Sequence, residues 1–464
     1  MKTKKELAFN ILTKTDGYKL LHADQYPKGT EYVYSNLSTR KSNHKFIKDN
    51  IYVFGLKYIR DKLISEWDIF FKLNKKEIKE LLDDFEEFNI KYHNLDSYNI
   101  KRFYELWEYG KLPLEIKVID DRMIIPIGAP IINIYNTDKR FYWMTNYIES
   151  NLLTSVWPLI TSSTISFNLK NLFTKWLNKT SDNISFAEFQ GKDFSFRGMS
   201  GTESGLLSGI GHLANFEGSS TLISIIEYKK HFGRLGTSIP ATEHSIMTSY
   251  QKENEKESFM NLLKIYPKGN LSIVSDTWNL WNVLDVILPS LKEAIEERDG
   301  KLIIRPDSGN PIKIICGNDE SNNPLEKMGS LRLLEKHFGS TINSKGYKVL
   351  NKKIGLIYGD SINFDTINKS LKQIEKIGFS TENIVFGLGA TLYQNNNRDT
   401  FGFVFKATSI VINEKRISML KNPITNKIKK SHEGLVGVFK EGDKFIYKDN
   451  LSVEEFNSNK NIIK

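Results

Sequence analysis

The sequence is informative first for what it lacks. It has one cysteine, Cys316, among 464 residues, which excludes an intramolecular disulfide framework and a zinc site built from cysteines. The first residues carry no apolar run typical of a secretory signal, and no stretch approaches the roughly 18 apolar residues of a membrane-spanning helix. We therefore expect a cytoplasmic protein with no membrane segment.

The sequence has fewer acidic than basic residues: 55 Asp and Glu residues against 65 Lys and Arg residues, for a net charge of +10. The excess is scattered, with its densest tract at 421–431, and no helix-turn-helix, zinc-finger or stacking-aromatic motif accompanies it. These features argue against nucleic acid as a partner. The balance suits a polyanionic small substrate, and a solvated lysine-rich surface explains most of the excess.

The length exceeds what a single hydrophobic core usually supports, so we expect more than one packed unit. The predicted fold class is α/β, with a barrel-like parallel (β/α) domain flanked by an α+β domain built from both chain termini. We assign residues 1–150 to the N-terminal α+β domain, 151–392 to the barrel-like domain, and 393–464 to a β-rich segment that packs on the N-terminal domain.

The apolar periodicity behind this division changes along the chain. Residues 51–110 show helical spacing and are followed by two strand-like stretches, whereas from about residue 150 short apolar strands alternate with helical stretches. That alternation predicts a parallel sheet. The clearest strands end in charged or glycine residues, at the strand end where α/β folds build their sites: 193–198, 271–276, 301–309, 353–360 and 383–389.

The strongest local motif is KLIIRPDSGNP, residues 301–311, in which a strand delivers Arg305 and Asp307 into a turn. A guanidinium binds phosphate or a planar base, and a carboxylate accepts hydrogen bonds from ribose hydroxyls. The motif therefore fits a phosphoribosyl donor, although an Arg–Asp ion pair that closes a turn is the alternative.

Two further strand ends add groups for a sugar phosphate. Gly359 and Asp360 follow one strand and offer a bare backbone and a carboxylate. Gly389 and Ala390 follow the next strand and, with Arg398 shortly after, predict a cradle for a 5′-phosphate. Each motif alone is also common turn chemistry.

Aromatic and imidazole groups complete the candidates. Phe194 and Arg197 share one strand end, where a ring stacks on a flat base and a guanidinium binds pyrophosphate, or where both are structural. His244 beside Glu243 is either a structural hydrogen-bonding residue or a phosphate contact and phosphoacceptor. No Walker, zincin or nucleophile-elbow motif is present, and GIGHLA (209–214) lies in a helical stretch.

Taken together and in order, these segments resemble the nicotinamide phosphoribosyltransferases, a type II group that includes nicotinate phosphoribosyltransferase. The resemblance runs nearly end to end and is carried by blocks such as TDGYKLLHADQYP (15–27), HLANFEG (212–218), SIPATEHS (238–245), LIIRPDSGNP (302–311) and NRDTFGFVFKAT (397–408). It implies phosphoribosyl transfer from phosphoribosyl pyrophosphate (PRPP) to nicotinamide, giving nicotinamide mononucleotide and pyrophosphate, in a head-to-tail homodimer with shared active sites.

The resemblance also implies a role for individual residues. Tyr18 of one subunit stacks on the pyridine ring opposite Phe194 of the other, with Asp16, Arg305 and Ser220 also at the base. Asp307 holds the ribose hydroxyls. The remaining sugar, phosphate and pyrophosphate contacts fall to Arg40, Arg197, Ser238, Gly359, Asp360, Gly389, Ala390, Arg398, Lys406 and Lys421.

Catalysis in such a protein combines Arg305, Asp307, His244 and Asp276. His244 matches the histidine that ATP phosphorylates in this family, and Asp276 positions it. Mg²⁺ binds through the pyrophosphate with no direct protein ligand. The pyridine nitrogen is already a nucleophile, so no general base is required.

One departure from the family pattern leaves two alternatives for the pyridine base, nicotinamide and nicotinate. Nicotinamide enzymes usually place Thr-Asp after the HLANFEG block, and that aspartate accepts a hydrogen bond from the amide NH2 group of nicotinamide. This chain has Ser219 and Ser220 at these positions. Nicotinate phosphoribosyltransferase is therefore the alternative within the class. A non-catalytic nucleotide-binding protein is the alternative outside it.

Overall fold

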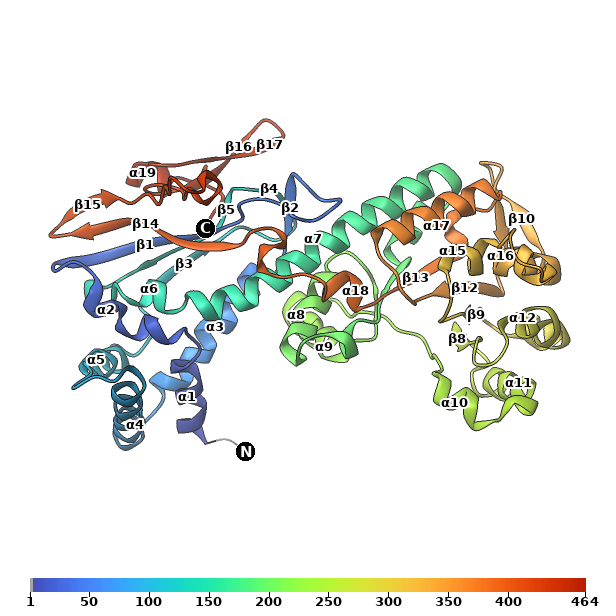
Figure 1. Cartoon of the computed structure of the whole chain (residues 1–464), viewed down its shortest axis with the longest axis horizontal. Coiled ribbons are helices and arrows are strands. Elements are labelled where there is room, and N and C mark those ends of the chain that lie inside the picture. Colours follow the sequence, from blue (N-terminus) through green and yellow to red (C-terminus); the bar gives the residue numbers. More distant parts are fainter. Residues whose placement is uncertain (1–2) are drawn as a thin grey trace. The chain divides into compact units, whose positions relative to one another are not determined.

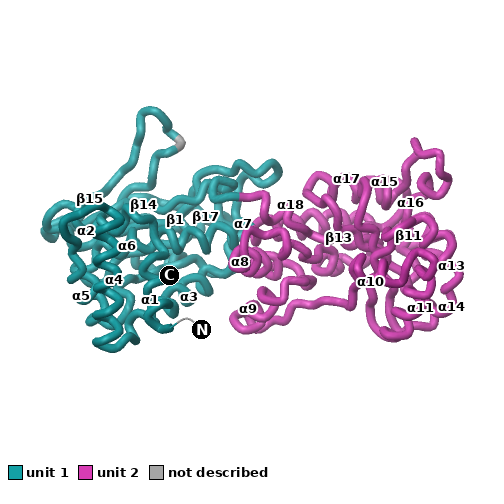
Figure 2. Tube along the Cα trace, turned by 60° about the horizontal axis from the view of Figure 1, so that its bottom comes forward, with its two compact units in different colours: residues 1–161, 397–464 teal, residues 162–396 magenta. Residues whose placement is uncertain are grey.

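The computed structural model describes residues 3–464 and divides into two compact units (Figure 2). Unit 1 contains the chain up to Thr161 and from Asn397 onward, whereas unit 2 contains Ser162–Asn396. Each unit is organised around a sheet of its own, and the two sheets differ in strand direction.

Unit 1 is built on a five-stranded antiparallel sheet in the order β15-β14-β1-β5-β3. A strand near the N-terminus pairs with one from the C-terminal part of the chain, since β1 lies against β14. This confirms the predicted α+β domain built from both chain termini. The strands are β1 (Thr30–Ser38), β3 (Leu114–Val118), β5 (Pro130–Asn136), β14 (Val404–Ile412) and β15 (Lys415–Ser418).

Helices lie on one side of this sheet in Figure 1, and the hairpin of β16 (Gly437–Glu441) and β17 (Lys444–Lys448) lies on the other. The periodicity seen from residue 51 becomes helical only at Leu56, because β2 (Asn50–Val53) pairs with β4 (Met123–Pro126). The helices bury one apolar face each. They are α1 (Lys4–Leu12), α3 (Leu56–Phe71), α4 (Lys75–His93) and α5 (Lys101–Tyr109).

Unit 2 contains a six-stranded sheet in the order β7-β6-β13-β12-β9-β8, and every pairing in it is parallel. The strands are short and their residues are mostly buried, as expected for a sheet covered on both faces. They are β6 (Gly191–Asp193), β7 (Gly218–Ser219), β8 (Leu271–Val274), β9 (Leu302–Arg305), β12 (Ile354–Tyr358) and β13 (Ile384–Leu388).

An extended segment, residues 237–242, bridges the two edge strands of this sheet. Thr237 pairs in parallel with Gly218 on β7, and Ala241 pairs in parallel with Ser272 on β8. Backbone hydrogen bonds support both contacts, for example from the amide of Thr242 to the carbonyl of Ser272 at 3.1 Å. The six strands and this segment therefore form a closed ring, which confirms the predicted barrel-like domain. We call residues 237–242 the closing segment.

Helices follow the strands of unit 2 along the chain. The GIGHLA stretch lies within α8, as its sequence context predicts. The long helix α7 (Glu149–Thr180) begins in unit 1 and ends in unit 2. The other long helices are α8 (Thr202–Leu213), α9 (Leu222–Phe232), α11 (Glu255–Ile265), α16 (Pro324–Phe338) and α17 (Phe364–Lys376). None of the helices among the described residues is long and apolar enough to cross a membrane.

Candidate active site

The carboxyl ends of the parallel strands in unit 2 collect most of the predicted site residues at one edge of the ring. Each lies at the end of its strand or within a few residues of it, because the charged and glycine residues follow the apolar run. We call this group the strand-end site. It contains Phe194, Arg197, Ser220, His244, Asp276, Arg305, Asp307, Gly359, Asp360, Gly389 and Ala390.

Asp276 and Asp307 are joined through the backbone. The amide of Asp307 donates to Oδ2 of Asp276 at 2.9 Å, and the hydroxyl of Ser308 donates to the same oxygen at 2.5 Å. The other oxygen of Asp276 is buried and has no hydrogen-bond partner within residues 3–464. Asp276 therefore holds the loop after β9 with one oxygen and keeps the second for a ligand or a neighbouring cation.

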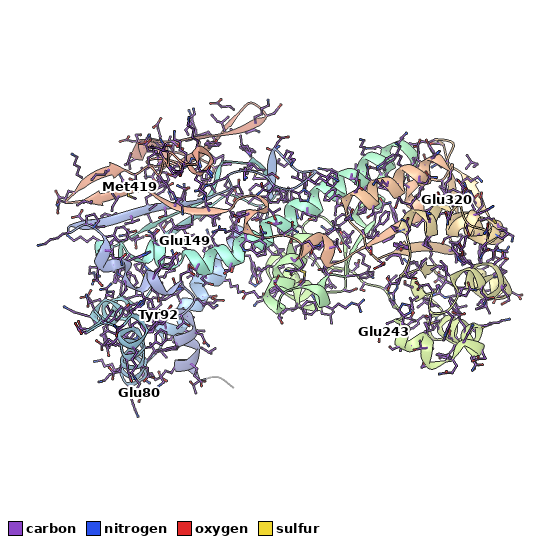
Figure 3. All side chains as sticks on the ribbon, viewed as in Figure 1. Glu80, Tyr92, Glu149, Glu243, Glu320 and Met419 are labelled. Carbon is purple, nitrogen blue, oxygen red and sulfur yellow. The ribbon has the colours of Figure 1, made fainter. Side chains whose placement is uncertain are left out.

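His244 is the first residue of α10 (His244–Ser249), directly after Glu243, which Figure 3 labels. Its Nδ1 lies 3.1 Å from Oγ1 of Thr277. Its Nε2 lies 3.9 Å from Oδ1 of Asp276 and 4.0 Å from Oδ2 of Asp307. The exposed imidazole therefore presents Nε2 between two carboxylates.

Arg305 is the last residue of β9 and is held by the closing segment. Its Nη2 donates to the carbonyl of Thr242 at 2.6 Å. Burial lowers the pKa of the guanidinium, and the carboxylates of Asp307 and Asp276 oppose that shift, so the group stays charged. Burial raises the pKa of the Asp307 carboxyl, Arg305 opposes the rise, and Asp276 adds to it.

Phe194 lies over two glycines at neighbouring strand ends. A methyl group on Gly387 would stand 2.5 Å from Cδ2 of Phe194, and one on Gly359 would stand 3.6 Å from the same atom and from Oδ1 of Asp307. The amide of Phe194 donates to the carbonyl of Leu388 at 2.9 Å and fixes the backbone there. The ring is partly exposed, so the arrangement leaves it available for stacking on a planar ligand.

The predicted phosphate cradle begins at Gly389, shortly after Gly387, the glycine that lies beneath the Phe194 ring. Gly389 precedes α18 (Ala390–Tyr393), and a methyl group on Gly389 would meet nothing within 4 Å. The loop after β6 approaches closely, because a methyl group on Gly198 would stand 2.5 Å from Cβ of Ala390. The backbone at Gly389 is thus open, as an approaching phosphate requires.

Four predicted phosphate and pyrophosphate contacts belong to unit 1 instead. Arg40 and Lys406 line one pocket of about 270 Å³, which we call the cation pocket, and sequence reasoning missed Lys430 and His432 beside them. Burial and the charge of Arg398 lower the pKa of Arg40, and Asp399 opposes that shift. Burial lowers the pKa of Lys406, Glu149 opposes the shift, and Arg40 and Lys421 add to it. The lining residues are Asn36, Ser38, Thr39, Arg40, Gly128, Val404, Lys406, Lys430, Ser431, His432, Tyr447 and Asp449.

The cation pocket contains an unsatisfied donor. Nη2 of Arg40 is buried and has no hydrogen-bond partner among the described residues. The imidazole of His432 is held by Asp449, 2.8 Å from Nδ1, and by the carbonyl of Gly128, 2.8 Å from Nε2. The pocket therefore has more cations than anions and suits a phosphorylated ligand.

Asp16 and Tyr18, the other predicted base contacts, also belong to unit 1. The side chain of Tyr18 is 61% exposed, and its ring lies 5.3 Å from that of His22. Asp16 accepts a hydrogen bond from Ser150 at 2.5 Å. Next to them, the buried ammonium of Lys19 pairs with Glu149, which Figure 3 labels. An aromatic residue this exposed is available for a ligand or a partner chain.

Two residues of β6 were not predicted. Asp193 is fully buried and accepts hydrogen bonds from Ser195, Ser219 and Thr221 at 2.7 to 2.9 Å. Lys192 is 8% exposed, and its ammonium donates to Oγ of Ser238 at 3.2 Å. A lysine inside a buried strand is the signal that would have found the second residue, since lysine is almost never buried without a reason.

A protein-built metal site is absent from the part of the chain that the structure describes. No group of three or more His, Cys, Asp or Glu side chains in residues 3–464 could hold a metal ion. A Mg²⁺ ion that binds chiefly to substrate phosphates needs only one or two protein ligands. The residues present are therefore compatible with an ion that arrives with the substrate.

Comparison with protein families places two matches on this chain. Residues 189–459 match the model of the nicotinate phosphoribosyltransferase (NAPRTase) family. Residues 10–116 match the model described as nicotinamide phosphoribosyltransferase, N-terminal domain. Together the matches span the strand-end site and both sets of unit 1 residues.

Individual proteins agree with the family models. The nicotinamide phosphoribosyltransferase of Acinetobacter baylyi is 39% identical over 97% of this chain and 92% of that protein, and that of Mycoplasma pneumoniae is 38% identical over 91% and 94%. Among solved structures, the nicotinate-nucleotide pyrophosphorylase of Pyrococcus furiosus is 11% identical with a TM-score of 0.55, covering 98% of this chain and 87% of that chain. Human nicotinic acid phosphoribosyltransferase is 12% identical with a TM-score of 0.51, covering 94% and 86%. The structural matches support the fold alone.

Proposed function

Because the chain belongs to the nicotinate phosphoribosyltransferase family, we propose that it transfers the phosphoribosyl group of PRPP to nicotinamide, giving nicotinamide mononucleotide and pyrophosphate. The observation that carries this function is the strand-end site, where Phe194, Arg305 and Asp307 meet at one edge of the ring. An aromatic ring, a guanidinium and a carboxylate are the groups that a pyridine base and a ribose require.

The reaction forms one bond and breaks one. The lone pair of the pyridine nitrogen forms the bond to the anomeric carbon of the ribose, and the bond from that carbon to the pyrophosphate oxygen breaks with its electron pair on the leaving group. Positive charge develops on the sugar during this exchange, so the carboxylates of Asp307 and Asp276 favour the transition state. No proton leaves the base, and no side chain has to act as a general base.

The leaving pyrophosphate calls for cations. We assign this role to Arg197 in unit 2 and to Arg40, Lys406 and Lys421 in unit 1, and the 5′-phosphate to Gly389, Ala390 and Arg398. The unpaired Nη2 of Arg40 and the surplus of cations around it support this assignment. Mg²⁺ bound to the pyrophosphate would neutralise further charge on the leaving group.

The same proposal includes a homodimer in which Tyr18 of one subunit completes the base site of the other. The exposure of Tyr18 supports it, as do Leu222 and Ile226, which lie one turn apart on α9 with exposures of 69% and 63%. Shared sites predict subunit complementation. After inactive Tyr18→Ala and Asp307→Ala variants are mixed and allowed to exchange subunits, half of the dimers should be mixed with one intact site each, restoring about a quarter of the wild-type activity. Absence of any recovery in exchanged dimers would exclude shared sites.

We also propose that ATP phosphorylates His244 and thereby stimulates turnover. The exposed imidazole, with Nε2 between Asp276 and Asp307, supports this role. His244→Ala should lose the stimulation by ATP and keep some ATP-independent turnover in a pyrophosphate-release assay. Stimulation that persists in this variant would remove the phosphohistidine from the mechanism.

Turnover with purified protein tests the central assignment. Protein, PRPP, Mg²⁺ and nicotinamide should give nicotinamide mononucleotide and pyrophosphate in equal amounts, with the Asp307→Ala variant as the inactive control. Turnover of nicotinate without any turnover of nicotinamide would show that nicotinate, and not nicotinamide, is the base substrate. Release of no pyrophosphate with either base would favour a non-catalytic nucleotide-binding protein.

A further inference from the structure

Lys192 is a buried cation with no ionic partner. It lies in the middle of β6, only 8% exposed, and Ser238 is its single hydrogen-bond partner in the chain from residue 3 to 464. No carboxylate in that range forms an ion pair with it. An ammonium has three donors, and burial of a charge without a counterion is costly, so the native protein carries a cost that needs an explanation.

The surroundings of this ammonium are those of the base site. Its Nζ lies 5.7 Å from the centre of the Phe194 ring. A planar base that stacks on a ring lies with its centre about 4.5 to 7 Å away, within reach of the same ammonium. Burial, reinforced by repulsion from the second cation Arg305, lowers the pKa of Lys192 to about 8.

The neighbouring aspartate does not supply the missing charge. Successive side chains of a strand point to opposite sides, and Asp193 points to Ser195, Ser219 and Thr221, which together donate four hydrogen bonds to its carboxylate. Ser219 is thereby engaged, and the next residue, Ser220, is exposed and uncharged. Positions 219 and 220 therefore offer hydroxyls and no acid.

We propose that Lys192 is a specificity-determining residue of the base site, whose ammonium binds the exocyclic carboxylate of a pyridine-3-carboxylic acid and so extends the substrate range from nicotinamide to nicotinate. The inference rests on the proposed function and names the second substrate class of that site. A carboxylate supplies the counterion that the fold does not, whereas the carbonyl of an amide supplies one hydrogen bond without charge. No acidic side chain at Ser219 or Ser220 repels the carboxylate.

Binding of the two product mononucleotides tests this without any need for turnover. Calorimetric titration should show that wild-type protein binds nicotinic acid mononucleotide as well as nicotinamide mononucleotide. Lys192→Met should weaken binding of the acid by about 30-fold or more and binding of the amide by about threefold or less, because only the acid loses a charge-assisted bond.

A second readout separates binding from structure. Lys192→Met keeps an unbranched side chain only one atom shorter and removes a buried charge without a counterion, so its Tm should equal or exceed that of the wild type. A residue kept for stability alone would lower the Tm and would not discriminate between the two ligands. If the Met variant is unstable, Lys192→Gln repeats the measurement with a neutral donor.

Matched variants complete the design. Lys192→Arg keeps the charge and should keep the affinity for nicotinic acid mononucleotide that Lys192→Met loses. Lys229→Met, on the exposed side of α9, should change the affinity for neither mononucleotide. Equal weakening of both mononucleotides in Lys192→Met, no weakening of either, or no binding of the acid by the wild type would each overturn the inference. If the wild type binds both mononucleotides but shows no PRPP-dependent turnover with either base, the result would instead count against the proposed function.

Discussion

The strand-end site of unit 2 and the cation pocket of unit 1 handle charge in opposite ways. In the strand-end site, Asp276, Asp307 and Arg305 are tied to the backbone or to each other, and charges of both signs lie within a few ångströms. In the cation pocket, Arg40 and Lys406 face a surplus of like charge. The side chains of the first region are held by bonds within the protein, whereas the second region has a surplus of cations that an anionic ligand would neutralise.

The difference matches two parts of one reaction. Charge that develops on a sugar is stabilised best by groups that need not move, because reorganisation during the reaction costs free energy. A pyrophosphate brings several negative charges of its own and can neutralise cations that repel one another in the free protein. Variants in the two regions should therefore change different kinetic parameters.

The largest effect is expected from Asp307→Ala in the strand-end site. We expect kcat/KM to fall by about 100-fold or more, because a carboxylate that stabilises the charged sugar is removed. The fold should remain intact by circular dichroism. Asp319→Ala, which removes an exposed carboxylate from the same unit, is the matched control, and an unchanged kcat/KM in Asp307→Ala would refute the ribose role.

Arg40→Ala in the cation pocket should act on the donor substrate. We expect the KM for PRPP to rise about 30-fold with a much smaller change in the KM for nicotinamide, since a charge-assisted contact to phosphate is lost. Steady-state kinetics with each substrate varied in turn measures both. Lys415→Ala, an exposed cation of β15, is the control, and an equal rise in both KM values would break the contrast between the regions.

A pH titration sharpens the comparison within the strand-end site. Burial and Arg305 lower the pKa of Lys192 to about 8, so its ammonium is present below that pH and is lost above it. The ratio of kcat/KM for nicotinate to that for nicotinamide should therefore fall about tenfold between pH 7 and pH 9, since kcat/KM follows groups of the free enzyme. In Lys192→Met we expect this ratio to stay constant with pH. A constant ratio in the wild type as well would show that Lys192 does not select the base.

Gly387→Ala tests the packing under the aromatic ring and should have the smallest effect. Its methyl group would meet Cδ2 of Phe194 at 2.5 Å and force the ring to shift. We expect a loss of about 1 to 3 kcal/mol in stability and a several-fold rise in the KM for the base. Thermal unfolding and kinetics measure both, with Gly201→Ala, where a methyl group meets nothing within 4 Å, as the control.

Much of unit 2 follows from the sequence because its strands are short and apolar and end abruptly in polar residues. That pattern placed β8, β9, β12 and β13 and brought Arg305 and Asp307 to one edge. The strand expected over 193–198 was wrong, because β6 covers Gly191–Asp193 and ends where that stretch begins. The closing segment escaped prediction because Ser238, Pro240 and Thr242 interrupt any strand-like run, and its pairing depends on partners far along the chain.

Lys192 and Asp193 show a second limit of the sequence. Both side chains are buried, and a sequence that is polar on both sides of a strand does not tell which residue points to the interior. The cation pocket shows a third, because Arg40 and Lys406 come from strands or loops more than 300 residues apart and meet only through the pairing of β1 with β14. The roles assigned to individual site residues from the family resemblance stay predictions.

The closing segment has a consequence for how the size of the base site is set. Ser238 at one end binds the ammonium of Lys192, and Thr242 at the other end holds Arg305 through its carbonyl. Its backbone is fastened to β7 on one side and β8 on the other, so the span between these two anchors is a fixed length of main chain. We therefore expect that inserting or deleting one residue in the closing segment would move Ser238 relative to Thr242 and alter which bases fit the proposed site, even if every side chain of the site were kept.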